Sequence, residues 1–279
     1  MKTLLTSLVA SIAVVCSLAF QANPPEAHGP KGKLVVVGGG GTTPEIMERA
    51  FELAGGKSAR MLIVAQASSN PEAGEESKVF WMEKGATDVG VLDLTDEAQA
   101  LREVAKAAFI WMPGGDQSRL FDELAKTKIP AAIRKRYEEG AVVGGTSAGA
   151  AVMSQVMLVG GDKADLKSVR AGGSQTAEGL GVWPAVIVDQ HFVKRQRFTR
   201  LLACVLDHPE LVGIGIDEKT AVVVSGSHCE VIGESSVLVI DARSAKRAPA
   251  KDTELQSASD MKLSVFKSGD NFDLAPKAK

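Results

Sequence analysis

The chain has 279 residues, of which 45% are hydrophobic and 24% are charged, and this is the balance of an ordinary globular protein. These fractions exclude a chain that is disordered throughout, because such a sequence can bury a sizeable core. Lys and Arg number 32 and Asp and Glu 34, so the net charge of −2 argues against broad nucleic-acid binding, which needs a basic surface.

The N-terminal segment predicts export. Lys2 supplies a positive charge, and residues 4–20 contain no charged residue and end among small side chains. This pattern is typical of a secretory signal peptide, which we place at 1–22, followed by a Pro-rich leader at 23–32. An uncleaved membrane anchor is the alternative, since about 17 apolar residues is the lower limit for spanning a bilayer. We expect a secreted or periplasmic protein with no stable membrane insertion once the signal is cleaved.

Short apolar runs then alternate with helical patterns, which predicts a parallel sheet with helices on both faces. The expected strands are 34–37, 61–65, 89–92, 107–112 and 141–143, and the clearest helices are 44–54 and 75–84. We interpret residues 33–279 as a single catalytic α/β domain. In such folds, ligands gather at the carboxyl ends of the strands.

The pattern changes after about residue 185. A further strand is expected at 186–188 and a helix at about 195–206, followed by closely spaced strands that favour hairpins at a mixed edge of the same sheet. Those strands are 213–216, 221–224, 229–232 and 237–240, and a polar loop at 242–260 leads to a final hairpin at 261–274.

The strongest chemical signal is the nucleophile elbow around Ser147. Residues 145–149 read Gly-Thr-Ser-Ala-Gly, which fits the pattern G-x-S-x-G, with a strand before and a helix after. The glycines let the strand and helix backbones approach, and the helix amides can stabilise negative charge. We expect the amides of Gly115 and Ala148 to form an oxyanion hole. The alternative is a Gly-rich turn that binds an anion.

A serine nucleophile needs a base, and the chain offers four His. His191 directly follows the strand at 186–188, so we place it at the same edge of the sheet as Ser147. His28 lies in the leader, His208 at a helix end and His228 in a hairpin turn.

The base needs an orienting acid. Glu218 follows an apolar strand, and its neighbour Asp217 is the obvious competitor. An α/β-hydrolase would run in the order Ser, acid, His, and would need Asp189 or Asp207 with His228. That alternative leaves the residues around His191 unexplained.

Several segments of the sequence together resemble those of a known protein family. They are 113–117, 144–150, 213–221, and the Asp-Gln-His-Phe segment 189–192 with Arg195, Arg197 and Arg200 after it. Between about residues 33 and 274 the chain resembles cyanophycinase, a serine exopeptidase of the same family as peptidase E. The segment with the spaced arginines is the most specific part, because it separates cyanophycinases from peptidase E, which acts on short α-aspartyl peptides.

The resemblance implies a flavodoxin-like sheet, as in class I glutamine amidotransferases, and a catalytic triad of Ser147, His191 and Glu218. It also implies a homodimer and a substrate pocket that is lined by Gln117, Gln190, Arg195, Arg197 and Arg200. The family's polymer, cyanophycin, is a polyaspartate with an arginine on each β-carboxyl, and hydrolysis releases β-Asp-Arg dipeptides. Two departures from the family's pattern are the four glycines at 38–41 and the residues Val193-Lys194 between Phe192 and Arg195, which add a positive charge. Both departures concern the exact substrate.

The charges agree with an acidic substrate. If residues 194–200 are helical, Lys194, Arg197 and Arg200 share one face, and Arg forks bind carboxylates. A solvated charged face is the alternative. A serine hydrolase or aspartyl dipeptidase of other specificity, or a silent protein that binds acidic peptides, also stays open.

The cysteine and histidine spacings predict no metal site. The chain lacks CxxC and HExxH motifs, so we expect no metal and no cofactor. After signal cleavage, Cys204 and Cys229 remain, and they either pair or form two separate buried thiols.

Overall fold

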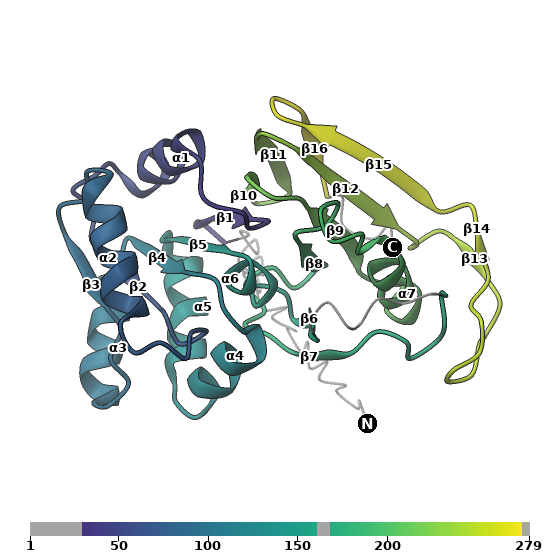
Figure 1. Ribbon diagram of the computed structural model, residues 1–279, viewed down its shortest axis with the longest axis horizontal. Coiled ribbons are helices and arrows are strands. Elements are labelled where there is room, and N and C mark those ends of the chain that lie inside the picture. Colours follow the sequence, from purple (N-terminus) through teal and green to yellow (C-terminus); the bar gives the residue numbers. More distant parts are fainter. Residues whose placement is uncertain (1–29, 161–167, 275–279) are drawn as a thin grey trace, which may run out of the picture.

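The computed structural model describes residues 30–160 and 168–274, and two β-sheets dominate this part of the chain (Figure 1). The larger sheet has eight strands in the order β16-β11-β10-β1-β5-β4-β2-β3. Five neighbouring strands are parallel: β1 (Lys33–Val37), β5 (Val142–Thr146), β4 (Phe109–Met112), β2 (Met61–Ile63) and β3 (Val89–Val91). The mostly parallel sheet predicted from the apolar runs is confirmed.

Helices cover both faces of the parallel strands. On one face lie α1 (Pro44–Ala54) and α2 (Ala73–Glu83), and on the other lie α3 (Glu97–Lys106), α4 (Gln117–Ala125) and α5 (Ile129–Glu139). The side chains of β1 alternate between the two cores: Val35 and Val37 pack with α1 and α2, whereas Leu34 and Val36 face the other helices. This alternation explains why the predicted strands read as continuous apolar runs.

Three antiparallel strands extend the sheet beyond β1. They are β10 (Thr220–Ser225), β11 (His228–Gly233) and β16 (Asn271–Asp273). A tight turn joins β10 to β11, so this pair is a hairpin, as the close spacing of the predicted strands indicated.

A second sheet corrects the prediction of one continuous sheet. Its strands are β15 (Lys262–Lys267), β12 (Ser236–Asp241), β9 (Val212–Ile216) and β8 (Val186–Gln190), in that order. One face packs into the core shared with the first sheet, and α7 (Phe198–Asp207) covers the other. The small elements are α6 (Ala148–Ala151) and the pairs β6 (Val156–Leu158) with β7 (Thr176–Glu178) and β13 (Lys246–Arg247) with β14 (Ala258–Ser259).

The final hairpin predicted at 261–274 is wrong. β15 pairs with β12 and β16 pairs with β11, so the turn between them carries the chain from one sheet to the other. The two strands have the local pattern of a hairpin, but each pairs with a strand of a different sheet. Phe266 and Phe272 still meet, with stacked rings 4.5 Å apart, where the two sheets face each other.

The helix predicted at 195–206 begins later, at Phe198. Residues 192–197 form turns, and Gln196 has a positive φ of 54°, which a regular helix does not allow. The cause is a distant carboxylate: Asp217 accepts hydrogen bonds from the backbone amides of Val193 and Lys194.

The two cysteines do not pair. Cys204 is buried between α7 and the second sheet, and Cys229 is buried in the core between the sheets, so both are free thiols. Across residues 30–160 and 168–274, no helix combines the length and the apolar character that a membrane crossing requires. The signal peptide predicted at 1–22 lies outside the described residues.

Candidate active site

A strained turn between β5 and α6 presents the Ser147 hydroxyl. Ser147 has φ 54° and ψ −112°, which residues other than glycine rarely adopt. Two glycines make room for this turn. A Cβ on Gly145 would lie 2.5 Å from the carbonyl oxygen of Gly149, and one on Gly149 would overlap the carbonyl oxygen of Met112. The G-x-S-x-G spacing therefore has a steric cause, the close approach of two backbones.

Three distant segments bring a hydroxyl, an imidazole and a carboxylate into contact. Ser147 Oγ lies 3.0 Å from Nε2 of His191, which directly follows β8. His191 Nδ1 lies 2.7 Å from Oε1 of Glu218, two residues after β9 ends. The order of contact is Ser, His, Glu, which is the geometry that a serine nucleophile with a base and an orienting acid requires.

The residues that were alternatives to Glu218 as the acid and to His191 as the base make other contacts. Besides the two backbone amides, the Asp217 carboxylate accepts a hydrogen bond from the Ser235 hydroxyl at 2.8 Å, so its side chain braces the turn after β8. His228 is exposed on β11, where its ring contacts Asn271 and Asp273. The α/β-hydrolase alternative, which needs His228 as the base, therefore finds no support in the geometry.

The surroundings of His191 keep its imidazole neutral. Burial lowers its pKa, the hydrogen bond to Glu218 raises it, and the positive charges of Arg195 and Arg197 lower it again, so that the pKa ends below its ordinary value. At neutral pH, Nδ1–H then donates to Glu218, and Nε2 is left to accept the proton of Ser147. This is the protonation state that a general base needs.

The end of β1 and the two residues after it hold all three contributing segments. The carbonyl of Val37 accepts the amide of Ser147 at 3.0 Å, that of Gly38 accepts the amide of His191 at 2.7 Å, and that of Gly39 accepts the amide of Lys219 at 2.7 Å.

Two glycines of this segment also touch the side chains. A Cβ on Gly39 would overlap the imidazole of His191, and one on Gly40 would lie 2.6 Å from Cβ of Glu218. From the sequence, the four glycines at 38–41 were connected with the choice of substrate, but not with the packing of His191 and Glu218.

A polar cavity of about 220 Å³ opens beside Ser147. Four of the five residues predicted to bind substrate line it: Gln117, Gln190, Arg195 and Arg197. Gln190 is 4% exposed, and its Oε1 atom is buried without a hydrogen-bond partner in the described part of the chain. An unpaired buried acceptor is costly unless a ligand supplies a donor.

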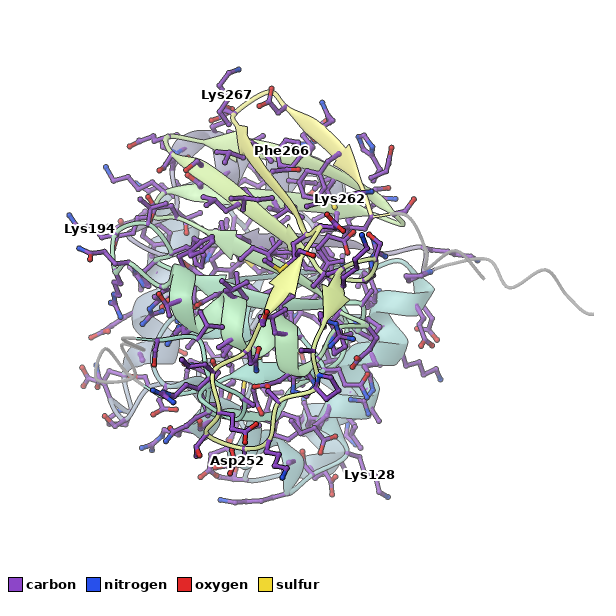
Figure 2. All side chains as sticks on the ribbon, turned by 90° about the vertical axis from the view of Figure 1, so that its right-hand side faces the viewer. Lys128, Lys194, Asp252, Lys262, Phe266 and Lys267 are labelled. Atoms are coloured by element: carbon purple, nitrogen blue, oxygen red, sulfur yellow. The ribbon has the colours of Figure 1, made fainter. Side chains whose placement is uncertain are left out.

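Arg200 is the exception, because it does not line this cavity. Its guanidinium is buried and binds both carboxylate oxygens of Asp189, at 2.7 Å through Nε and in an even closer contact through Nη2. Arg197 lies next to this pair and donates to the carbonyl of Gln190 at 2.8 Å. Lys194 is exposed and points away from the body of the protein (Figure 2). The predicted basic stripe of Lys194, Arg197 and Arg200 is therefore wrong, since these residues are not on one helical face.

The two backbone amides predicted for an oxyanion hole lie next to Ser147. Ala148 is the first residue of α6, and the amide at that position has no partner within the helix. Gly115 lines the same cavity as Ser147 and has a φ of 144°, and a Cβ there would lie 2.5 Å from the carbonyl oxygen of Ala67. Gly115 follows β4 and Ala148 follows β5, so the two residues come from neighbouring strands of the sheet, and their role as an oxyanion hole stays a prediction.

With this geometry in place, the comparisons with known proteins decide the family. The sequence pattern of peptidase family S51 matches residues 34–232, which include Ser147, His191 and Glu218. The chain belongs to peptidase family S51. It is therefore a hydrolase of peptide bonds.

Relatives of this S51 peptidase include proteins named cyanophycinase. The one from Geminocystis herdmanii is 43% identical over 205 residues, which cover 71% of this chain and 75% of the relative. The one from Nostoc sp. is 35% identical over 242 residues, which cover 82% of this chain and 80% of the relative.

Solved structures share the fold. A peptidase from an acI-B1 Actinobacterium superposes with a TM-score of 0.63 at 22% identity, covering 87% of this chain and 97% of the other. A putative peptidase E protein from Listeria monocytogenes gives a TM-score of 0.53 at 17% identity, covering 73% and 99%. The S51 peptidase thus has the α/β fold of these proteins.

Proposed function

We propose that this S51 peptidase is a serine exopeptidase that hydrolyses cyanophycin to β-Asp-Arg dipeptides. The observation that carries the proposal is the unbroken series of contacts from Ser147 through His191 to Glu218, beside a cavity lined by arginine and glutamine. The proteins named cyanophycinase, at 43% and 35% identity, support the choice of polymer.

The chemistry follows from the contacts. Ser147 Oγ attacks the scissile carbonyl carbon while His191 Nε2 takes its proton, and the amides of Gly115 and Ala148 stabilise the oxyanion. Glu218 holds the charged imidazole in place. The C–N bond then breaks, His191 returns the proton to the leaving amine, and an ester remains on Ser147. Water attacks this ester with His191 again as the base, which releases a carboxylic acid and the free hydroxyl.

The cavity explains a preference for carboxylates. Each arginine branch of the polymer has a free α-carboxylate, and Arg195 and Arg197 supply guanidinium groups that bind such groups with two hydrogen bonds. The unpaired Oε1 atom of Gln190 accepts a hydrogen bond from a substrate amide or guanidinium. The neutral donors of Gln117 complete the polar lining. In this proposal, Arg200 acts only through Asp189 and Arg197, as a positioning residue.

The direct test compares Ser147→Ala with Ser58→Ala, an exposed serine after α1. Incubation with cyanophycin granules, followed by mass spectrometry of the soluble products, should show the dipeptide for wild type and Ser58→Ala. The Ser147→Ala variant should lose about 10⁴-fold or more in kcat while its melting temperature is kept. Near-normal turnover by Ser147→Ala would show that Ser147 is not the nucleophile. Cleavage of neutral esters or α-aspartyl dipeptides in place of the polymer would show that cyanophycin is not the substrate.

Export and a homodimer also belong to the proposal. The uncharged segment at 4–20 supports export, and the resemblance to cyanophycinase supports the dimer. Expression of the full chain, with N-terminal sequencing of the periplasmic fraction, should give a mature start near residue 23. Light scattering should give about twice the mass of the mature chain. A full-length cytoplasmic product would contradict export, and a monomer mass would contradict the dimer.

A further inference from the structure

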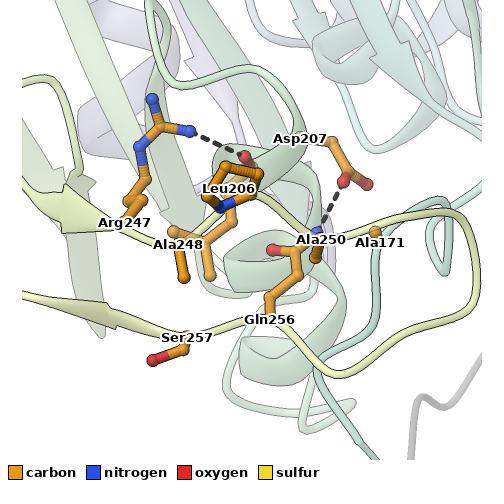
Figure 3. Close-up of a pocket in the computed structure, with 9 residues that line it drawn as sticks. Ala171, Leu206, Asp207, Arg247, Ala248, Ala250, Gln256 and Ser257 are labelled. Atoms are coloured by element: carbon orange, nitrogen blue, oxygen red, sulfur yellow. Dashed lines mark hydrogen bonds between the residues drawn. The ribbon is translucent and has the colours of Figure 1, made fainter.

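A second cavity lies at the far end of α7. The helix begins beside Arg197, which lines the catalytic cavity, and it ends at Asp207. Its 10 residues span about 15 Å at about 1.5 Å per residue. Residues 246–259, which we call the arm, fold over that end of the helix and enclose a cavity of about 230 Å³ (Figure 3).

The arm is held in place by hydrogen bonds to the segment before β7. The Ala171 amide donates to the Glu254 carbonyl at 3.0 Å, and the Ala171 carbonyl accepts from the Thr253 amide at 2.9 Å. Arg170 Nη1 donates to the carbonyl of Thr253 at 2.8 Å. Figure 2 places Asp252 at the tip of the arm, away from the two sheets. The arm is therefore attached to residues 170 and 171 by three hydrogen bonds.

One side of the cavity consists of hydrogen-bond acceptors. The Asp207 carboxylate accepts from the Gly172 amide at 3.0 Å and from Gln256 Nε2 at 2.5 Å. This orientation leaves Gln256 Oε1 buried, with no partner among the described residues. Asp207 forms no ion pair with any described Lys or Arg, and burial raises the pKa of its carboxyl. The negative end of the α7 dipole is also here. This side favours a cation with several N–H donors.

The opposite side offers a guanidinium. Figure 3 shows Arg247 across the cavity from Asp207, with its Nη1 atom 3.3 Å from the carbonyl of Leu206. No described Asp or Glu forms an ion pair with Arg247, so the other N–H groups of its fork can bind a carboxylate. Ala248, Pro249 and Ala250 supply apolar wall between the two charged ends.

These features together describe one ligand chemistry. The ligand has a guanidinium at one end, an aliphatic stem in the middle and a carboxylate at the other end. The volume is below the range of about 300–1,000 Å³ that is typical of pockets for drug-sized molecules, which suits a single amino-acid side branch. An arginine whose α-amine is acylated has this chemistry, because its guanidinium and its α-carboxylate are both free.

We propose that the second cavity binds an arginine branch of the polymer, with the guanidinium at Asp207 and Gln256 and the α-carboxylate at Arg247. This inference rests on the proposed function, since each unit of that polymer carries such a branch. The length of α7 corresponds to about four or five residues of extended chain at about 3.3 Å each. A polymer held at both cavities would thus be anchored several units before the bond that is cleaved.

Two-point attachment has a kinetic signature. Binding at the second cavity raises the effective concentration of the chain end at Ser147, so it lowers KM for the polymer without changing the chemical step. A substrate of two units is too short to reach from one cavity to the other. Loss of the second cavity should therefore raise KM for the polymer alone.

The kinetic test uses two charge-matched variants of the arm. Arg247→Gln removes the carboxylate donor, and Lys251→Gln removes a positive charge that does not line the cavity. Ala250→Phe fills the cavity while leaving both charges. We expect Arg247→Gln and Ala250→Phe to raise KM for soluble cyanophycin about tenfold, with kcat unchanged and with unchanged kinetics on the two-unit substrate. Lys251→Gln should match wild type. A KM for the polymer within twofold of wild type in both cavity variants would overturn the proposal.

A binding measurement separates this inference from the proposed function. Calorimetry on Ser147→Ala protein with Nα-acetyl-L-arginine should show two saturable sites, one in each cavity, and the Ser147→Ala, Arg247→Gln double variant should lose the site in the second cavity while the site beside Arg197 is kept. Agmatine, which lacks the carboxylate, should bind at least tenfold more weakly. If wild type cleaves no cyanophycin but this binding pattern is found, the proposed function fails and the arginine site stands. Equal binding with and without Arg247 would refute the arginine site in the second cavity, even if the enzyme degrades the polymer.

Discussion

Adding one methyl group at Gly39 should disable the enzyme without unfolding it. Gly39 has a φ of 104°, and its missing Cβ is the space that the His191 imidazole occupies. A Cβ would meet Cε1 and Nε2, the edge of the ring that faces Ser147. Ordinary contact begins near 3.4 Å, so the ring or the Gly39 backbone must move by about 1 Å.

The size of the effect follows from the Ser147–His191 contact. A shift of about 1 Å would lengthen the 3.0 Å distance between Oγ and Nε2 beyond hydrogen-bond range. Misplacement of this size costs about 10²-fold in rate, and we expect that loss in kcat for Gly39→Ala. Strain from a side chain at positive φ adds roughly 1–2 kcal/mol of lost stability.

Gly41→Ala is the matched control. Gly41 has nearly the same φ, 106°, but a Cβ there would meet nothing within 4 Å. Both variants should therefore lose similar stability in a thermal melt, whereas only Gly39→Ala should lose kcat on cyanophycin. If Gly39→Ala turns over at the wild-type rate, or if Gly41→Ala is slowed equally, contact with the imidazole is not the reason for glycine at this position.

Four further predictions concern the site. Glu218→Gln should lower kcat about 10⁴-fold with an unchanged melting temperature. Asp217→Asn should mainly lower the melting temperature, because Asp217 binds the amides of the turn after β8. Because burial lowers the pKa of His191 below the ordinary value of 6.5, the acidic fall of kcat/KM should have its midpoint below pH 6.5; a midpoint above pH 6.5 would contradict this. Arg197→Gln should raise KM for the polymer more than it lowers kcat, and the opposite ratio in steady-state kinetics would place Arg197 in the chemistry.

Local sequence signals were sufficient for the elbow and the parallel strands. A strand, a tight turn and a helix follow one another around Ser147. The glycines of this pattern indicate that neighbouring backbones approach closely. His191, with either Glu218 or Asp217 as its acid, could be proposed because each follows an apolar strand, and the resemblance to cyanophycinase selected Glu218. The strands β8 and β9 that carry these residues lie in the second sheet, which local patterns did not indicate.

The predictions that were wrong concern residues whose conformation depends on residues far away in the sequence. Residues 194–197 have helical spacing, but Asp217, more than 20 positions away, binds the amides of Val193 and Lys194 and turns the chain. Arg200 was predicted to line the substrate pocket, but its guanidinium is buried against Asp189, a partner that helical spacing does not reveal. The split into two sheets likewise depends on which strands pair, and apolar runs do not encode that choice.

The convergence of the site has a single structural origin in the segment after β1. Ser147, His191 and Lys219 have φ values of 54°, 49° and 53°, so each contributing segment leaves its strand through a turn that is unfavourable for a side chain. Each of these strained residues donates its amide to a consecutive carbonyl, of Val37, Gly38 and Gly39. A residue in such a turn persists only where its surroundings hold it, and these three hydrogen bonds come from one strand end that lies in the middle of the larger sheet. The relative positions of nucleophile, base and acid therefore depend on 37–39 more than on the two sheets that carry them, which is why a small change there should affect kcat before it affects folding.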